Sequence, residues 1–399
     1  MHPPAQILES IAARFGTPCY VYTLSILEDR CQQLLAALPA AHVRFAVKAN
    51  STGEILRRVF AHGMGADVVS GGELARAQRA GVDASRIVFS GVGKQDWEIE
   101  AGLKASVSFN AESTEEIGRI HAWAEKLNTK AKLLLRVNPN IPAKTDPYIS
   151  TGLYATKFGI AERDLETAVR LARSLPRLSL MGLSCHLGSQ ITDLSVFEQG
   201  AKRLSELAAP LRQGHPEFRQ LNLGGGLAVR YNQETPPSIE SYGKVLLSAA
   251  ASVGMELIVE PGRWLVAECG GLLTRAITVK STPEKTFVVV DAAMNDLLRP
   301  SLYKAHHPAT PVTPREGAPV KVDIVGPVCE TGDFLALDRT LPPILPSDLV
   351  WIGTCGAYGS TMASQYNSRA RAAEVLLENE TPRLIRKRES LDALWSQEV

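Results

Sequence analysis

The chain has 399 residues, of which 45% are hydrophobic and 21% charged, and its formal net charge is +1. This length suggests two or more domains, and the small net charge gives no reason to expect nucleic acid or an anionic membrane as a partner. The sequence has no apolar run long enough to span a membrane, no secretory signal at its start and no CxxC pair among its six cysteines, which favours a cytoplasmic protein with reduced thiols and no metal centre.

Eight short apolar runs alternate with segments of helical periodicity over the first two-thirds of the chain. The predicted strands are VRFAVKA (43–49), GADVVS (65–70), RIVFSG (86–91), VSFN (107–110), AKLLLRVN (131–138), SLMGLSCH (179–186), QLNLGGG (220–226) and ELIVEPG (256–262). Apolar runs without alternation are typical of strands buried on both faces, and strands that alternate with helices usually pair in parallel. The pattern therefore predicts a closed (β/α)8 barrel over residues 25–270. An open doubly wound sheet is the alternative, which the lack of a glycine-rich dinucleotide turn after the first strand disfavours.

Helical segments become rare after residue 270. There ITVKS, TFVVVD, VKVDIVG and DLVWIGTCG predict strands, and proline-rich connections join them. We therefore predict a mainly β C-terminal domain over residues 271–399, with residues 1–24 packing against it. The stretch LLENETPRLIRKRES near the end is predicted to form one closing strand and a short helix.

Polar residues follow the predicted barrel strands, and the active site of a (β/α)8 barrel lies at the carboxyl ends of its strands. Lys48 ends the first strand, where burial would lower the pKa of its amine and make it a nucleophile. An isolated lysine at such a place is more often a solvated surface residue. Glu260 follows the eighth strand between apolar neighbours. A buried carboxylate needs a partner, either a protonated pyridine nitrogen or an arginine such as Arg263.

Two further segments are candidates for holding an anion or an aromatic ring. The run LGGGLA (223–228) ends the seventh strand, and its glycines allow either a close approach to a phosphate or a tight turn. In CHLGSQ (185–190), His186 either packs in the core or stacks on a cofactor ring, and Ser189 is placed to bind phosphate.

Taken together, these strand-end residues predict pyridoxal 5′-phosphate as a cofactor. Lys48 would bind its aldehyde, Glu260 its ring nitrogen, and the glycine run with Ser189 its phosphate. The prediction depends on the barrel, because only a closed barrel brings these distant segments to one mouth.

The C-terminal domain carries a second group of candidates. In IVGPVCETGDFL (324–335), Cys329 has polar neighbours, so it is a candidate proton donor to a carbanion, the alternative being a buried structural thiol. In DAAMNDLLRPSLYKAHH (291–307), Arg299 offers a bidentate grip on a carboxylate. The segment GAYGSTMASQYNSR (356–369) is rich in Gly and Ser and is predicted to be a ligand-binding loop.

Eight segments, in chain order, form a specific pattern. They are FAVKAN, YISTGLYATKFGI (148–160), CHLGSQ, NLGGGLAVRY, VEPGRW, MNDLLRPSLY, GPVCETGDFL and GAYGSTMASQYNSR. This pattern resembles that of diaminopimelate decarboxylase, a pyridoxal-phosphate enzyme of the alanine-racemase-like barrel class. The resemblance implies a (β/α)8 barrel plus a β domain, a homodimer that shares its active site across the interface, and decarboxylation of meso-2,6-diaminopimelate to L-lysine and CO2, the last step of lysine biosynthesis. The departures, within GGGLAVRY and TGLYATKFGI, match no catalytic position of the family.

The resemblance also assigns roles to single residues. It makes Lys48 the lysine that binds the cofactor's aldehyde, Cys329 the proton donor supplied by the partner subunit, and His186 the histidine that stacks on the cofactor ring. The predicted cofactor contacts, from the segments above and from the resemblance, are Lys48, Asp67, His186, Ser189, Gly225, Gly226, Glu260, Pro261, Gly262, Arg263 and Tyr358. The implied substrate contacts are Arg263, Arg299, Tyr303, Glu330 and Tyr358.

Three alternatives are weighed against this interpretation. Relatives of this fold that form diamines from ornithine or arginine tend to place Asp after the catalytic Cys, whereas Glu330 follows Cys329 here. Amino-acid racemases of this class place Arg at the ring nitrogen, whereas this chain has Glu260. A cofactor-binding protein without activity would lack Lys48 or Cys329, and both are present.

Overall fold

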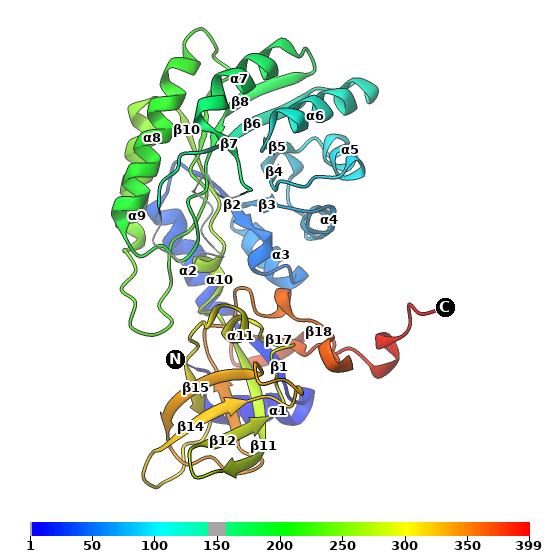
Figure 1. The fold of residues 1–399 in the computed structure, drawn as a ribbon, viewed down its shortest axis with the longest axis vertical. Coiled ribbons are helices and arrows are strands. Elements are labelled where there is room, and N and C mark those ends of the chain that lie inside the picture. Colours follow the sequence, from blue (N-terminus) through cyan, green and yellow to red (C-terminus); the bar gives the residue numbers. More distant parts are fainter. Residues whose placement is uncertain (1, 143–156) are drawn as a thin grey trace. The chain divides into compact units, whose positions relative to one another are not determined.

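The computed structural model describes residues 2–142 and 157–399, so the part of the quoted motif at 148–156 lies outside the described residues (Figure 1). The chain forms two compact units. We call Arg30–Val229 with Thr235–Trp264 the barrel unit. The residues up to Asp29, together with Arg230–Glu234 and Leu265–Val399, are called the β unit.

Among the described residues, the barrel unit contains eight parallel strands that close on themselves. They are β2 (His42–Ala46), β3 (Gly65–Val68), β4 (Ile87–Phe89), β5 (Ser108–Ala111), β6 (Ala131–Asn138), β8 (Leu178–Ser184), β9 (Gln220–Asn222) and β10 (Glu256–Val259). Each pairs with the next, and β10 pairs with β2 to complete the ring. A two-residue strand, β7 (Ile160–Ala161), pairs with β6. The predicted (β/α)8 barrel is confirmed, and each predicted run overlaps one strand.

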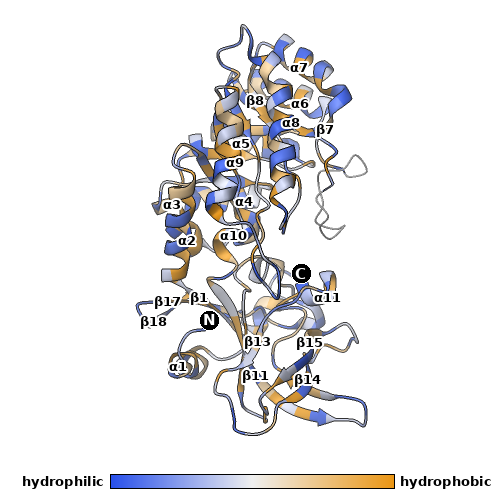
Figure 2. Ribbon diagram, turned by 90° about the vertical axis from the view of Figure 1, so that its left-hand side faces the viewer, coloured by the Kyte–Doolittle hydropathy of each residue, from blue (hydrophilic) through white to orange (hydrophobic). Residues whose placement is uncertain are grey.

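Helices follow the strands and cover the outside of the barrel (Figure 1). They are α3 (Gly53–Ala61), α4 (Gly71–Arg79), α5 (Asp96–Lys104), α6 (Thr114–Lys126), α7 (Leu165–Ser174), α8 (Leu194–Arg212) and α9 (Ile239–Ser252), while α2 (Leu24–Ala37) precedes β2. In α7 the buried residues Leu165, Ala168, Val169 and Ala172 recur at helical spacing. Figure 2 shows hydrophobic and hydrophilic residues alternating along these helices, as expected when one face of each packs on the strands.

The β unit is built on one sheet, with the strand order β15-β14-β12-β11-β1-β17-β18; β16 pairs with β11 and β13. The strands are β1 (Cys19–Thr23), β11 (Gly270–Ser281), β12 (Thr286–Val290), β13 (Ala309–Pro311), β14 (Val320–Val325), β15 (Phe334–Leu341), β16 (Leu349–Ile352), β17 (Ala373–Glu378) and β18 (Thr381–Arg386). Two pairs, β1 with β17 and β12 with β14, are parallel, and the other pairs are antiparallel. The mainly β C-terminal domain is confirmed.

The N-terminal residues supply a helix and an inner strand to this unit. On α1 (Ala5–Phe15), Leu8 and Ile11 are fully buried, in one cluster with Val21 of β1 and Val375 of β17. Burying a side chain of this size contributes about 2 kcal/mol. The helix at Ala5–Phe15 and the strand at Cys19–Thr23 therefore contribute to the core of the β unit.

Residues 373–386 form a hairpin, so the prediction of one closing strand was wrong. Asn379 and Glu380 connect β17 to β18, and both have positive φ, 48° and 64°. Two successive residues of positive φ are typical of a type I′ turn, whose usual signal is Asn-Gly. Glu380 in place of Gly hid the turn from sequence reasoning. The short helix predicted within residues 376–390 is not observed there, and a 3-10 turn follows at Leu391–Leu394.

Close packing of the barrel strands generates a stability prediction. A Cβ added at Gly182, in β8, would lie 1.7 Å from the carbonyl oxygen of Gln220, a backbone atom that cannot move aside. Gly182→Ala is therefore expected to lower the free energy of unfolding by about 3 kcal/mol, measured by denaturant unfolding.

The matched control is Gly118→Ala in α6, where an added Cβ meets nothing within 4 Å. Alanine is the better helix former, so this change is expected to be neutral or to stabilise the protein by up to about 1 kcal/mol. Equal effects of the two substitutions would contradict the packing described for β8 and β9.

Candidate active site

Lys48 lies just beyond the end of β2 and is held by a buried acid on the neighbouring strand. Its Nζ is 2.6 Å from Oδ2 of Asp67, a residue of β3 that is 1% exposed. The register of the two strands pairs Ala46 with Asp67 and so sets this contact. Burial by itself would raise the pKa of Asp67, but the adjacent Lys48 outweighs burial, and the pKa of Asp67 lies below its ordinary value.

Glu260 follows β10 and lies in the same group of charges. Its Oε1 accepts hydrogen bonds from the side-chain amides of Asn222, at 2.5 Å, and Asn110, at 3.5 Å. Burial, followed by the negative charge of Asp67, raises the pKa of Glu260 to about 7, although Asn222 and Lys48 act in the opposite direction. A cation placed beside Glu260 would lower this pKa and stabilise the carboxylate.

The turns after β2 and β10 are joined directly. The backbone N–H of Ala46 donates to the carbonyl oxygen of Pro261 at 3.0 Å. A Cβ at Gly262 would lie 3.0 Å from Cβ of Ala46 and 3.1 Å from Cβ of Ala49, so only Gly fits without displacing the turn that carries Lys48. These contacts bring the predicted residues of the two strand ends to one place.

Several buried polar atoms of the barrel interior have no hydrogen-bond partner among the described residues. They are Nη1 of Arg44, Oδ1 of Asp67 and Oδ1 of Asn110. The charges of Glu260 and Asp67 both act on Arg44, which is 5% exposed in β2. Because an unpartnered buried polar atom costs about 1–3 kcal/mol, this part of the barrel is suited to a polar ligand.

The glycine run packs tightly between the ends of β8 and β10. A Cβ at Gly225 would lie 2.3 Å from the carbonyl oxygen of Glu260, and one at Gly226 would lie 2.5 Å from that of Gly188. Gly226 also has a φ of 115°, which L side chains rarely adopt. Glycine is thus required here both by close approach and by backbone conformation, and the predicted tight turn is observed.

His186 contacts this run through its ring. Its Nδ1 accepts a hydrogen bond from the N–H of Gly225 at 3.2 Å. Desolvation, with the positive charges of Arg136 and Lys48, lowers the pKa of His186 to about 3. The ring is therefore neutral near pH 7, with its proton on Nε2, as its hydrogen-bond partner also requires.

Ser189 and Arg263 meet beside the same strand ends. Nε and Nη2 of Arg263 donate to Oγ of Ser189 at 3.2 and 3.0 Å, and Arg263 is 6% exposed. A hydroxyl held by a guanidinium is a suitable site for an anion such as phosphate. Arg263 is thus bonded to Ser189, whereas the sequence suggested it as an ion-pair partner of Glu260.

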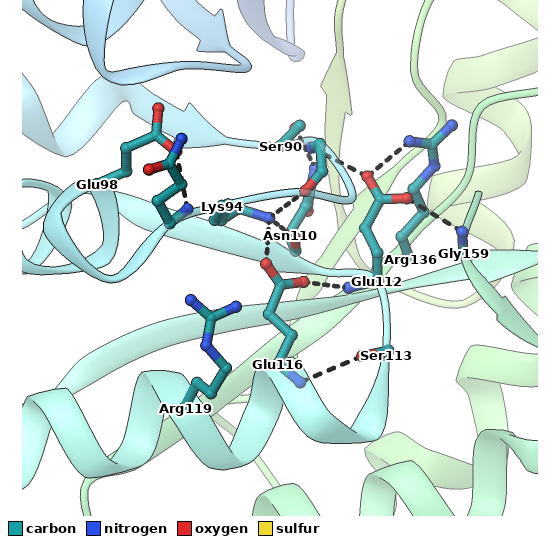
Figure 3. Close-up of polar contacts among 12 residues, drawn as sticks. Ser90, Lys94, Glu98, Asn110, Glu112, Ser113, Glu116, Arg119, Arg136 and Gly159 are labelled. Carbon is teal, nitrogen blue, oxygen red and sulfur yellow. Dashed lines mark hydrogen bonds and ion pairs between the residues drawn. The ribbon is translucent and has the colours of Figure 1, made fainter. Parts of the chain in front are cut away.

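A buried ionic network in the same barrel was missed by sequence reasoning (Figure 3). Nζ of Lys94 donates to Oε1 of Glu116 at 2.8 Å and to the carbonyl oxygens of Gly91 and Asn110, also at 2.8 Å. Lys94 is 3% exposed and Glu116 6%. The other oxygen of Glu116 accepts from the N–H of Glu112. This lysine thus fixes the turns that follow β4 and β5.

Glu112 continues the network to Arg136 on β6. Its Oε1 is 2.8 Å from Nη1 of Arg136 and accepts from the N–H of Gly91, while its Oε2 accepts from the N–H of Gly159 (Figure 3). The charge of Arg136 also acts on His186. Apart from Arg136, which lies near the end of a predicted strand, no charged residue of this network was predicted, because its acids lie in polar segments that are typical of a protein surface.

The remaining predicted residues belong to the β unit. Cys329 is exposed, whereas the other five cysteines are buried, and all six are free thiols. Burial raises the pKa of Cys19, Cys185 and Cys355 to about 12. An accessible thiol fits proton transfer better than these buried ones.

The turn that carries Cys329 is built by an acid that the sequence did not single out. Asp333, which is 4% exposed, accepts from the N–H groups of Val328 and Met294, both at 2.7 Å. Burial raises the pKa of Asp333. Next to the thiol, Oε2 of Glu330 accepts from the hydroxyl of Tyr366 at 2.7 Å.

Two tyrosines and an arginine complete the β-unit candidates. Arg299 and Tyr303 lie on α11 (Arg299–Tyr303), and Arg299 is 6% exposed. Tyr358 lies in the predicted loop and has a φ of 56°, which is rare for a tyrosine and is most often retained at functional sites.

These observations define a class of protein. The family described as "Pyridoxal-dependent decarboxylase, pyridoxal binding domain" matches residues 24–267, which contain all eight barrel strands. The chain is therefore a pyridoxal-dependent decarboxylase by class, and pyridoxal 5′-phosphate is its cofactor.

The similar proteins narrow the class. A diaminopimelate decarboxylase of Neisseria meningitidis serogroup A is 47% identical over 98% of this chain and 96% of its own length. One from Zymomonas mobilis is 45% identical over 98% and 94%. The crystal structure of the Helicobacter pylori enzyme complexed with L-lysine superposes with a TM-score of 0.94, at 41% identity and 98% coverage of both chains. The chain belongs to the diaminopimelate decarboxylase family.

The residues present fit pyridoxal phosphate. Lys48 offers an amine at a strand end. Asp67 offers a carboxylate with one unpartnered oxygen, and Glu260 offers a carboxylate whose raised pKa a nearby cation would lower. Gly226 and the Ser189 hydroxyl offer an anion site. Within the described residues, no helix is both long and apolar enough to cross a membrane.

The buried network generates a second prediction. Glu116→Gln would leave the Lys94 ammonium buried without its counter-charge, and breaking a buried pair from one side typically costs about 3–5 kcal/mol. We expect the free energy of unfolding to fall by about 3 kcal/mol in denaturant unfolding. Glu115→Gln, at the exposed neighbouring position, should change it by less than about 0.5 kcal/mol. A variant at residue 116 as stable as the control would mean that this ion pair is not formed.

Proposed function

We propose that this chain decarboxylates meso-2,6-diaminopimelate to L-lysine and CO2, the last step of lysine biosynthesis, with Lys48, Glu260 and Cys329 as its principal catalytic groups. The single observation that carries the proposal is the interacting group of half-buried Lys48, buried Asp67 and half-buried Glu260 at the mouth of a barrel of the pyridoxal-dependent decarboxylase family.

Bound pyridoxal phosphate supplies an electron-withdrawing ring that stabilises the negative charge left on the α-carbon when CO2 departs. Lys48 would hold its aldehyde, and Asp67 would hold the Lys48 ammonium when that amine is free. Glu260, kept in place by the side-chain amide of Asn222, would hold a proton at the ring nitrogen. His186, which is neutral, would pack against the ring without adding positive charge.

The anion site follows from the same contacts. The N–H groups of Gly224 and Gly225 donate to Asn222 and His186, so we assign the phosphate to Gly226, Ser189 and Arg263. Pro261 and Gly262 shape the turn next to it, which brings the backbone close to the cofactor without a side chain in the way.

The β-unit residues act on the substrate. Cys329 returns a proton to the α-carbon after CO2 has left. Arg299 binds the distal carboxylate of the substrate, with Arg263, Tyr303 and Tyr358 as further contacts. Glu330, oriented by Tyr366, binds the distal ammonium.

The choice among related reactions depends on three positions. Glu330 beside Cys329 favours a substrate with a distal ammonium and carboxylate over ornithine or arginine, and leaving Arg299 without a carboxylate would reject such analogues by up to about 10⁴-fold. Glu260, an acid at the ring nitrogen, favours decarboxylation over racemisation. We also propose a cytoplasmic homodimer in which Cys329 acts across the interface, as the resemblance to the family implies.

The proposal is tested by CO2 release from the purified holoenzyme with meso-diaminopimelate, lysine, ornithine and arginine side by side. Only meso-diaminopimelate should give substantial turnover. Lys48→Ala should abolish both turnover and the visible absorbance of the lysine-bound cofactor, whereas Lys104→Ala, at an exposed position, should change neither. Faster release from ornithine, or activity in Lys48→Ala, would refute the assignment.

Cys329→Ala separates protonation from cofactor binding. The variant should keep the cofactor absorbance and lose turnover by about 10²–10⁴-fold, the usual contribution of a general acid. Cys31→Ala, which removes a buried thiol of α2, is the control and should keep its rate. A rate near wild type for Cys329→Ala would place the proton donor elsewhere.

A further inference from the structure

Two adjacent histidines of the β unit are held in the same unusual way. Nε2 of His307 lies 2.8 Å from Nη1 of Arg299, and its Nδ1 lies 3.0 Å from the carbonyl oxygen of Gly353. Nε2 of His306 contacts Nη1 of Arg339, and its Nδ1 lies 3.1 Å from a carbonyl oxygen, that of Tyr231. Each ring thus stands between a guanidinium and a backbone carbonyl.

The partners fix the protonation of both rings. A guanidinium only donates hydrogen bonds, so each Nε2 must accept and cannot carry a proton. A carbonyl oxygen only accepts, so each Nδ1 must carry the proton. Both histidines are therefore neutral and in the same tautomer, and His307, which is 0% exposed, is shielded from solvent as well.

Tyr231 holds the other side of the same arginine. Its ring centroid lies 4.6 Å from Cζ of Arg299, and it meets the ring of His307 edge-on at 5.2 Å. The backbone of Tyr231 is fixed in turn, because its carbonyl accepts from His306 and its N–H donates to Glu234 at 3.0 Å.

Arg339 connects the two histidines. It contacts Nε2 of His306, and its Nη2 donates to the carbonyl oxygen of His307 at 3.3 Å. The result is one connected group, buried at His307, Tyr231 and Arg299 and half-buried at His306 and Arg339. In it His306 orients Tyr231, and His307 and Tyr231 orient Arg299.

We propose that His307 is a positioning residue that, with Tyr231, aims the Arg299 guanidinium at the distal carboxylate of the substrate and so sets selectivity for ligands that carry this group. The inference rests on the role given to Arg299 in the proposed function. Neither His307 nor the Tyr231 ring carries negative charge, so both orient the guanidinium without cancelling its positive charge. An acid at position 307 would hold Arg299 as firmly and would compete with the carboxylate of the ligand.

L-Lysine and cadaverine provide the measurement, because they differ only in the carboxylate that lysine keeps at the distal end. Inhibition constants of both are measured against meso-diaminopimelate with the holoenzyme, and their ratio reports on the groups that bind the distal carboxylate, of which Arg299 is the principal one. His307→Leu removes the acceptor and should reduce the preference for lysine by roughly 10-fold or more, the value of a hydrogen bond to a charged group. Cadaverine binding and cofactor absorbance should stay unchanged, which a general loss of structure would not allow.

His307→Gln and His307→Glu form a matched pair of variants. They test whether His307 positions Arg299 even when the leucine variant does not fold. The glutamine oxygen can accept from Arg299 in place of Nε2, so His307→Gln should keep most of the preference for lysine. His307→Glu should lose it. The control His42→Leu, at an exposed histidine of β2, should leave the ratio unchanged.

The outcomes separate this inference from the proposed function. Arg299→Ala should abolish the preference for lysine. If it does, and the folded variants at position 307 all stay within about 2-fold of wild type, His307 does not position Arg299 and the inference is wrong while the proposed function stands. If Arg299→Ala leaves the ratio unchanged, the distal carboxylate is bound elsewhere, and both the role of Arg299 and the inference fall.

Discussion

The parallel pairing of β10 with β2 is the constraint on which the barrel site depends. It closes the ring of strands, and the bond from Ala46 to Pro261 carries that closure into the turns beyond the strands. Lys48 and Glu260, which are far apart in sequence, therefore act on the same buried charges. An open sheet of the same strands would leave β2 and β10 unpaired with each other, and the two residues would not share an environment.

Closure also decides which residues the barrel can tolerate inside. Arg44, Asp67 and Asn222 lie within strands and are at most 5% exposed, although burying polar groups is unfavourable unless they are bonded. Asp67 is bonded to Lys48, and Asn222 donates to Glu260. The unpartnered oxygen of Asp67 and the raised pKa of Glu260 are costs that a bound cationic ring would offset. These buried polar groups make the barrel interior less stable than an apolar interior would be, but they also place polar atoms where the cofactor can bind.

Sequence reasoning succeeded where the signal is local. Runs buried on both faces marked all eight barrel strands, and Lys48, Glu260 and the glycine run stood out because they interrupt or end those runs. Sequence reasoning failed for residues whose interaction partner lies far away in the sequence. Nothing in the sequence around Lys94 or Glu116 shows that they meet, because the two residues become neighbours only after β4 and β5 pair. The hairpin at Asn379 was missed for a different reason, since Glu380 adopts a backbone conformation that the usual turn signal reserves for Gly.

The structure holds its two candidate cations in opposite ways, and the difference follows from what each must bind. In the proposed function Lys48 forms and releases a covalent bond, and a carboxylate at 2.6 Å gives its free ammonium a stable place. In the same proposal Arg299 attracts a carboxylate, and a carboxylate at position 307 would compete with the ligand for the guanidinium. Neutral acceptors avoid this competition, because His307 offers a lone pair and Tyr231 a ring face, and neither brings a full negative charge. An imidazole between an arginine and a carbonyl oxygen is well suited to this purpose, since the carbonyl holds the one proton on Nδ1 and the guanidinium opposes a second proton on Nε2.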